Sequence, residues 1–115
     1  WEAYTDGGRE RSHRDVLLWM DEALGRGVGE ILVTSIDRDG TRRGFDLELA
    51  SAVTARAETP VIVHGGAGSP ESAAELYGAA RPDAIALASV LHYDDATIAD
   101  VKAALAERGA AVRAC

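Results

Sequence analysis

Short apolar runs alternate along the chain with stretches in which apolar residues recur at helical spacing. The runs predict β-strands, and the helical stretches predict helices with one apolar face. Ser12 is the predicted cap of the first helix, and Ser69 followed by Pro70 is a strong helix start. The predicted order is a loop over 1–11, a helix over 12–25, a strand over 30–36, a helix over 46–57, a strand over 60–64, a helix over 70–80, a strand over 83–88, a short turn over 89–92 and a last helix, capped at 95 or 97, that ends at 109.

This alternation of strands and helices predicts an α/β fold with a parallel sheet and right-handed crossovers. Three strands are too few to close a barrel. The chain is therefore either a small open sheet or a part of a larger parallel structure. The strands that begin at Glu30 and Asp83 would each have one unpaired side. Since both strands are apolar, we expect the isolated chain to self-associate.

The composition is that of a single domain spanning residues 1–115. With 47% apolar and only 5% aromatic residues, the core must be largely aliphatic. The net charge of −7 argues against a nucleic-acid partner, and no apolar run is long enough to predict a membrane span. Cys115 is the only cysteine, so no disulfide can form within one chain, which fits a reducing cytoplasm.

An abruptly polar stretch, Thr34–Gly44, follows the first predicted strand. Its carboxylates, Asp37 and Asp39, stand two residues apart where the strand should end, and Gly40 and Gly44 bracket a loop. The carboxyl ends of parallel strands are where open α/β sheets and barrels build active sites. A solvated loop with an aspartate turn would explain the same pattern.

A glycine run, Gly65–Gly68, lies between a predicted strand and a helix start. Glycines allow close backbone approach and a helix start favours anions, so the run predicts a site for a single phosphate ester. Ala88-Ser89 supports this, because barrel enzymes often bind phosphate with two such loops and a short extra helix. A tight turn alone would also need glycine. His64 would either contact the phosphate or pack at the rim.

The other candidates for chemistry are weaker. No spacing of His, Cys or carboxylate residues matches a metal site or a nucleophilic triad, so we expect no metal. We expect His13 to face water and His92 to be structural. The arginines at 9–14 and 42–43 fall in predicted loops, where they are either solvated or attract an anionic ligand.

Taken together and in order, several motifs resemble the cyclase subunit of imidazole glycerol phosphate synthase. They are Trp1–Arg9, Thr34-Ser-Ile-Asp-Arg-Asp-Gly-Thr41, Gly65–Gly68, Ala88-Ser89 with His92, and Glu107–Arg113. The resemblance covers essentially the whole chain, and the combination is specific although each motif alone is not. It implies a (β/α)8 barrel, of which this chain would be roughly the carboxyl-terminal half of a TIM barrel, from helix five through helix eight.

The resemblance also implies an activity. The family is a cytoplasmic lyase of histidine biosynthesis that uses ammonia from a glutaminase subunit. Its phosphorylated substrate is a phosphoribulosyl formimino carboxamide ribonucleotide. Its products are imidazole glycerol phosphate and an aminoimidazole carboxamide ribonucleotide. No metal or organic cofactor is implied.

Residue by residue, the resemblance assigns candidate roles. Asp39 matches an acidic residue at the mouth of the active site and is the candidate catalytic residue. The candidate substrate-binding residues are Thr5, Thr34, Gly40, His64, Gly65, Gly66, Ala88 and Ser89. His64 departs from the family, which usually has serine before the glycine run, and its larger ring alters the expected hydrogen bond to phosphate.

The family's two acid/base aspartates match positions upstream of Trp1, so this chain alone is expected to be inactive. Two alternatives remain. One is the sister isomerase of the same pathway, which has a similar Asp-Gly-Thr loop; Ser35-Ile-Asp-Arg38 and the form of Gly65–Gly68 favour the cyclase. The other is a non-catalytic half-barrel module that binds phosphate.

Overall fold

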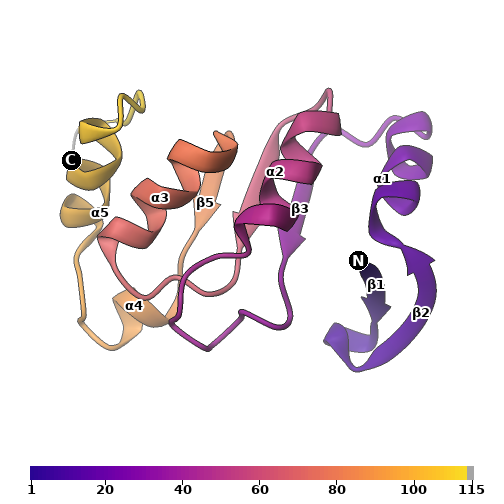
Figure 1. Ribbon diagram of the computed structural model, residues 1–115, viewed down its shortest axis with the longest axis horizontal. Helices are drawn as coiled ribbons and strands as arrows, with labels where there is room; N and C mark the ends of the chain where they lie inside the picture. Colours follow the sequence, from indigo (N-terminus) through magenta and orange to yellow (C-terminus); the bar gives the residue numbers. More distant parts are fainter. Residues whose placement is uncertain (114–115) are drawn as a thin grey trace.

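The computed structural model describes residues 1–113, so the prediction for Cys115 lies outside the described residues. From α1 onward the elements follow the predicted order, with ends within a few residues of those expected (Figure 1). Among residues 1–113, no helix combines the length and apolar character needed to cross a bilayer. The elements are β1 (Glu2–Thr5), η1 (Asp6–Gly8), β2 (Glu10–Asp15), α1 (Val16–Gly25), β3 (Ile31–Thr34), α2 (Leu47–Arg56), β4 (Val61–His64), α3 (Pro70–Ala80), β5 (Ala84–Ala86), α4 (Ser89–His92) and α5 (Ile98–Glu107).

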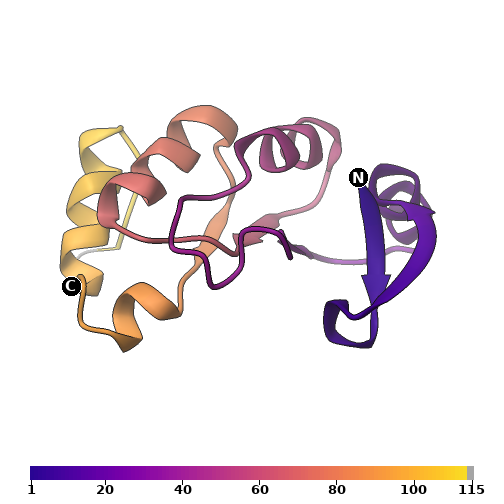
Figure 2. The ribbon, with the colours of Figure 1, turned by 60° about the horizontal axis from the view of Figure 1, so that its bottom comes forward.

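The main sheet is parallel and runs in the order β3-β4-β5, which confirms the predicted parallel sheet. Its register places Val33 beside Val63 and Val63 beside Ile85. The helices α2 and α3, which connect these strands, lie on one face of the sheet (Figures 1 and 2). Each strand therefore pairs with the next one along the chain.

The core lies between the sheet and these helices. Val61 and Val63 of β4 are buried on the helix-facing side, where Val53 of α2 and Leu76 of α3 are also buried. Val101 of α5 joins the same cluster. As expected from the composition, the core is aliphatic apart from one phenylalanine. Its buried members are Met20, Val33, Phe45, Leu49, Ala50, Val53, Val61, Val63, Ala67, Ala73, Leu76, Val90 and Val101.

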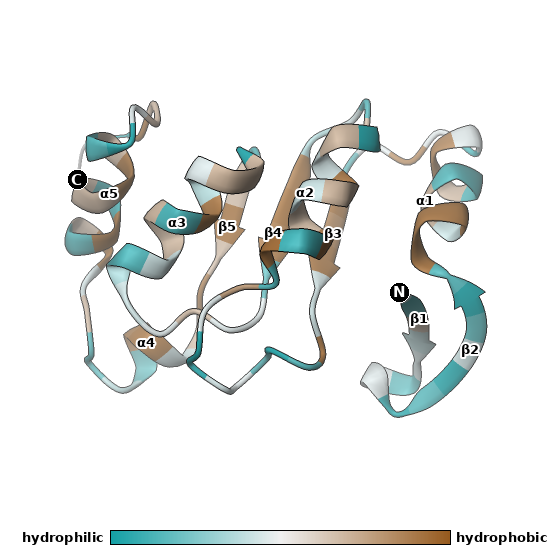
Figure 3. Cartoon of the chain, viewed as in Figure 1, coloured by the Kyte–Doolittle hydropathy of each residue, from teal (hydrophilic) through white to brown (hydrophobic). Residues whose placement is uncertain are grey.

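The opposite face of the sheet presents two rows of side chains that are not covered by α2 or α3. One row crosses the strands through Leu32, Ile62 and Ala84, and the other through Thr34, His64 and Ala86. The strands consist mostly of hydrophobic residues (Figure 3). The apolar run over 30–33 predicts a buried strand, and this prediction is wrong on the uncovered face, because Leu32 is 61% exposed. The reason is that α2 and α3 pack on only one side of the sheet, whereas the apolar run places hydrophobic side chains on both sides.

Residues 1–11 were expected to form a loop, and this expectation is wrong. β1 and β2 form an antiparallel hairpin in which Thr5 pairs with Glu10. The sequence of β2 is polar throughout and largely exposed, so it lacks the alternation that predicts a strand. Ser12 lies in β2 and donates to the carbonyl oxygen of Ala3 rather than capping α1. Asp15 is the cap, and its carboxylate accepts from the backbone N–H of Leu17 at 2.9 Å.

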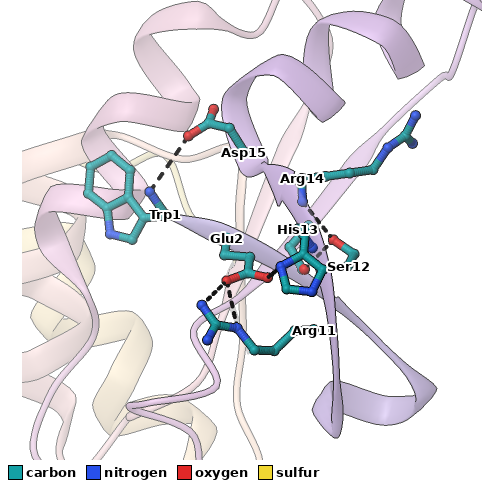
Figure 4. Close-up of polar contacts among 8 residues, drawn as sticks. Trp1, Glu2, Arg11, Ser12, His13, Arg14 and Asp15 are labelled. Carbon is teal, nitrogen blue, oxygen red and sulfur yellow. Dashed lines mark hydrogen bonds and ion pairs between the residues drawn. The ribbon is translucent and has the colours of Figure 1, made fainter.

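The polar side chains of the hairpin bind one another (Figure 4). The Glu2 carboxylate accepts from Arg11 Nη2 at 2.7 Å and from the backbone N–H of His13 at 2.9 Å. These hydrogen bonds, that from Arg11 first, lower the pKa of Glu2 below its ordinary value. Arg14 similarly pairs with Glu22 of α1. His13 is exposed, as expected, and the arginines of this segment are largely paired within the chain.

The hairpin and α1 are joined to the rest of the molecule by a few contacts. Met20 of α1 is buried in the core. Arg56 of α2 forms a two-pronged ion pair with Asp21, in which Nε donates to Oδ1 at 2.7 Å. The hydrogen bond from Arg56 lowers the pKa of Asp21 below its ordinary value. The hairpin turn at Gly8 also approaches the side chain of Ile36.

The last helix, α5, differs from expectation at one position. Thr97 caps it through a reciprocal bond with Asp100, in agreement with one of the two predicted caps. The helical spacing of Ile98, Val101 and Leu105 predicts that they face inward. Val101 is buried, but Ile98 is 54% exposed, so the prediction is wrong for Ile98. Ile98 is the first residue of the helix and borders an open groove between α5 and the start of β5.

Truncation of Leu76 is expected to destabilise the chain by about 2–5 kcal/mol, because the side chain is fully buried and its removal leaves a cavity. Leu76→Ala should therefore lower the denaturant midpoint of unfolding strongly. Leu18→Ala is the matched control, since Leu18 is 66% exposed. Equal losses for the two variants would contradict the core described above.

The outer edges of β3 and β5 have no partner strand within residues 1–113. Because Leu32 and Ile36 beside the β3 edge are largely exposed, we expect the isolated chain to form dimers or larger species at micromolar concentration. Sedimentation velocity would measure this, and Leu32→Lys should shift the distribution toward monomer. A stable monomer of the unmodified chain would refute the expectation.

Candidate functional site

A small pocket lies at the carboxyl edge of the sheet. Three connections form its walls: the β3–α2 loop, the turn after β4 and the turn between β5 and α4. The structure thus brings together most of the residues that the sequence singled out. The lining residues are Asp39, Gly40, His64, Gly65, Gly66, Ala67, Ala86, Ala88 and Ser89.

The β3–α2 loop is folded on itself before it reaches α2. The N–H of Asp39 donates to the carbonyl oxygen of Ser35 at 2.8 Å, and the Thr41 hydroxyl donates to that of Arg38 at 2.7 Å. Gly40 has a φ of 74°, a conformation that glycine adopts without strain. These turns place Asp39 and Gly40 against the pocket.

Gly66 and Gly68, after β4, must be glycines because another part of the chain, the β3–α2 loop, passes very close to them. A Cβ on Gly66 would lie 2.2 Å from the carbonyl oxygen of Gly44, and one on Gly68 would lie 2.1 Å from that of Arg42. The N–H of Gly44 also donates to the Gly66 carbonyl oxygen at 2.8 Å. The glycine run therefore lets the β3–α2 loop lie directly on the turn, a purpose that differs from the ligand approach expected from the sequence.

The start of α3 is less open to an anion than its sequence suggests. The hydroxyl of Ser72 accepts from the N–H groups of both Gly68 and Ser69, at 3.3 Å each. The carboxylate of Glu71 accepts hydrogen bonds from the backbone N–H of Glu71 and from the Ser69 hydroxyl. These bonds, the backbone one being the larger cause, lower the pKa of Glu71. The capping box thus occupies the donors of the helix start. The part of the turn that faces the pocket is Gly65–Ala67.

The third wall offers free donors. At the start of α4, the N–H groups of Leu91 and His92 donate to the carbonyl oxygen of Ala88. Within residues 1–113, the N–H groups of Ser89 and Gly66 and the Ser89 hydroxyl have no acceptor or partner in the chain. A polar ligand in the pocket would find these donors on two sides.

His64 occupies the middle of the polar row on the uncovered face of the sheet. Its Nδ1 lies 3.3 Å from Oγ1 of Thr34, the facing residue on β3. Its Nε2 lies 4.0 Å from Oδ1 of Asp39, which is about half exposed. Ala86, the facing residue on β5, is small and leaves room beside the ring. His64 therefore lines the pocket while touching two other candidate residues.

Two candidates lie outside this pocket. Thr34 borders a wider groove between the hairpin, α1 and β3, which Asp37 and Asp39 also border. Thr5 is exposed at the end of β1 and lines neither the pocket nor this groove. His92, for which we expect a structural role, packs edge-on against Tyr93 with ring centres 4.9 Å apart.

Sequence reasoning missed the partners of Arg42. Its guanidinium pairs with Asp95, beyond α4, and lies over the ring of Tyr93 with Cζ 5.4 Å from the ring centre. The sequence shows a cation in a loop, but nothing in it connects residues 42 and 95. Arg43, in contrast, forms no ion pair with any part of the chain that the structure describes.

The described residues contain no group of three or more His, Cys, Asp or Glu side chains arranged to hold a metal ion. The chemistry that the pocket offers is instead hydrogen bonding to an anion, from backbone N–H groups and a hydroxyl, beside one imidazole and one carboxylate.

Comparison with known proteins identifies relatives over nearly the whole chain. The model of the family described as "Histidine biosynthesis protein" matches residues 2–97. The chain is 48% identical over 113 residues to imidazole glycerol phosphate synthase subunit HisF of Symbiobacterium thermophilum, covering 98% of this chain and 44% of the relative. The subunit of the same name from Synechococcus is 48% identical over 89% of this chain and 40% of the relative.

A third relative, subunit HisF of Streptococcus mutans, is 43% identical over 98% of this chain and 45% of the relative. The chain thus spans less than half the length of the curated relatives it matches. Since the family model covers most of the residues, including all three walls of the pocket, the chain belongs to the histidine biosynthesis protein family.

Proposed function

We propose that this chain is the carboxyl-terminal part of a (β/α)8 barrel that acts as the cyclase subunit of imidazole glycerol phosphate synthase, and that it supplies one phosphate site. The observation that carries the proposal is the convergence of Asp39, Gly66 and Ser89 on one pocket, in a chain 48% identical to subunits of that name. All 115 residues would belong to one partial barrel domain.

The sheet supports the barrel part of the proposal. Its strands run in sequence order, both outer edges are free among the described residues, and one face carries rows of side chains without a covering helix. Strands that are apolar on both faces are typical of parallel sheets covered on both sides.

The phosphate would bind between the turn after β4 and the start of α4. The N–H groups of Gly66 and Ser89 and the Ser89 hydroxyl are the donors that support this placement. Bonds from these groups to an anion are charge-assisted and therefore stronger than bonds between neutral groups. His64 would add a further donor from the strand end, in place of the shorter serine hydroxyl that the family usually has.

Asp39 would act on the substrate beyond its phosphate. It borders both the pocket and the wider groove, so a substrate anchored by phosphate could extend past its carboxylate. A carboxylate within hydrogen-bond reach of the reacting atoms can orient them or transfer a proton. Thr34, at the end of β3, would line the same path.

In this function the ammonia would come from a glutaminase subunit, as the resemblance implies and as the word subunit in the relatives' names supports. The substrate would be the phosphoribulosyl formimino ribonucleotide. The products would be imidazole glycerol phosphate and aminoimidazole carboxamide ribonucleotide. The names of the relatives favour this cyclase over the sister isomerase.

We expect the 115-residue chain alone to make no measurable imidazole glycerol phosphate from this substrate and ammonia. The acid/base aspartates of the family match positions upstream of Trp1, and the loss of each such group typically slows turnover by about 10²–10⁴-fold. A full-length HisF relative would be the positive control in the same assay. Turnover comparable to that control would contradict the proposal, and consumption of the isomerase's substrate instead would favour the sister enzyme.

Removal of the Ser89 hydroxyl is expected to weaken phosphate binding by about ten- to a hundredfold, because a hydrogen bond to a charged group is lost. The measurement is a titration of the isotopically labelled chain with inorganic phosphate, followed through the amide resonances of Gly66 and Ser89. Ser51→Ala on α2 is the matched control and should bind like the unmodified chain. Equal affinity in Ser89→Ala and the control would place the site elsewhere.

A further inference from the structure

The β3–α2 loop, which forms the first wall of the pocket, extends away from β3 and toward α4 (Figures 1 and 2). Within this loop, Arg42 has a φ of 59°, which L residues rarely adopt. The guanidinium pairs with the Asp95 carboxylate and lies over the Tyr93 ring, 5.4 Å from its centre. The loop is thus tied to the segment that follows the third wall.

The same loop is held against the second wall by backbone contacts. The N–H of Gly44 donates to the carbonyl oxygen of Gly66 at 2.8 Å, and Gly68 lies directly against the carbonyl oxygen of Arg42. Arg42 therefore stands where the loop, the glycine turn and the segment after α4 meet. Neither Arg42 nor Asp95 lines the pocket itself.

We infer that Arg42 is a positioning residue, and that its contacts with Asp95 and Tyr93 form a clasp that holds the Asp39-Gly40 wall in place around the bound phosphate. The inference deepens the proposed function and rests on it for the identity of the ligand. With the clasp open, the loop would lose its hold on the third wall, and its backbone bonds, including that of Gly44 to the turn, would open more often. Fewer molecules would then have a complete pocket.

The clasp is suited to this role because it contributes little to overall stability. Its ion pair is partly exposed, with side-chain exposures of 41% for Arg42 and 32% for Asp95, and such pairs contribute modestly to folding. A cation over an aromatic ring adds a comparable amount. Together they can bias one loop between two positions, so opening the clasp should weaken phosphate binding by about three- to tenfold.

The variant Asp95→Asn distinguishes an effect of the clasp from a general effect of charge on anion binding. It removes a negative charge, so a general charge effect would strengthen binding of an anion. The clasp inference requires the opposite, because Asp95→Asn releases Arg42 and should weaken binding. Arg42→Met should weaken it as well. Arg43→Met is the matched control, since it removes the same charge from the neighbouring residue, which forms no ion pair among the described residues.

The experiment measures two quantities on the isotopically labelled 115-residue chain. The first is the affinity for inorganic phosphate, from the amide shifts of Gly66 and Ser89. The second needs no ligand: it is the hydrogen exchange of the Asp39 and Gly44 amides, whose bonds hold the loop. We expect Asp95→Asn and Arg42→Met to lower both affinity and amide protection, with a thermal midpoint close to that of Arg43→Met. The double variant Arg42→Asp with Asp95→Arg should recover part of both.

Each outcome decides the inference. Unchanged protection in Asp95→Asn would overturn the clasp, as would binding that is tighter or unchanged. If the unmodified chain fails to bind phosphate, the proposed phosphate site fails. In that case the exchange data alone still test whether Arg42 holds the loop. A large fall in thermal midpoint shared by Asp95→Asn and Arg42→Met would also overturn the inference, since it would assign the pair to general stability.

Discussion

The contact between the β3–α2 loop and the glycine turn after β4 is the constraint on which the site depends. A single methyl group on Gly66 or Gly68 would overlap a carbonyl oxygen of the loop at 2.2 or 2.1 Å. Because no side chain stands between them, the two backbones can touch and Gly44 can bond to Gly66. This contact turns a long polar connection into one wall of a pocket. The donors on α4 then face a defined space instead of open solvent.

Much of the fold could be predicted from the sequence, because it follows from local features. The capping residues and the apolar spacing of α2 and α3 indicate their ends closely, and the alternation of elements implies a parallel sheet. The hairpin could not be predicted in this way. Its strand β2 has no apolar face, and it is held by a backbone ladder and by pairs such as Glu2 with Arg11. The exposure of Leu32 likewise depends on which face the helices cover, which periodicity alone does not indicate.

The candidate site also has some features that could be predicted from the sequence and others that could not. That Asp39, Gly66 and Ser89 share one edge follows from the topology, since the carboxyl ends of parallel strands meet there. Three features depend on distances between separated segments and lay beyond sequence reasoning. They are the closeness of the loop to the glycine turn, the hydrogen bonds that the Ser72 hydroxyl accepts from N–H groups at the start of α3, and the pairing of Arg42 with Asp95. Thr5, assigned by resemblance alone, lies apart from the pocket.

The separation along the chain of the contacts around the pocket suggests an order of assembly during synthesis. The contact between Thr34 and His64 spans 30 residues, and the bond between Val61 and Asp83 spans 22. The pair between Arg42 and Asp95 spans 53, and contacts between distant residues carry a larger entropy of loop closure. On a ribosome that releases the chain from its amino end, β3 and β4 can pair long before Asp95 emerges. We therefore expect the sheet to form first and the pocket to be completed last, so that a truncated nascent chain would have ordered strands but an incomplete pocket.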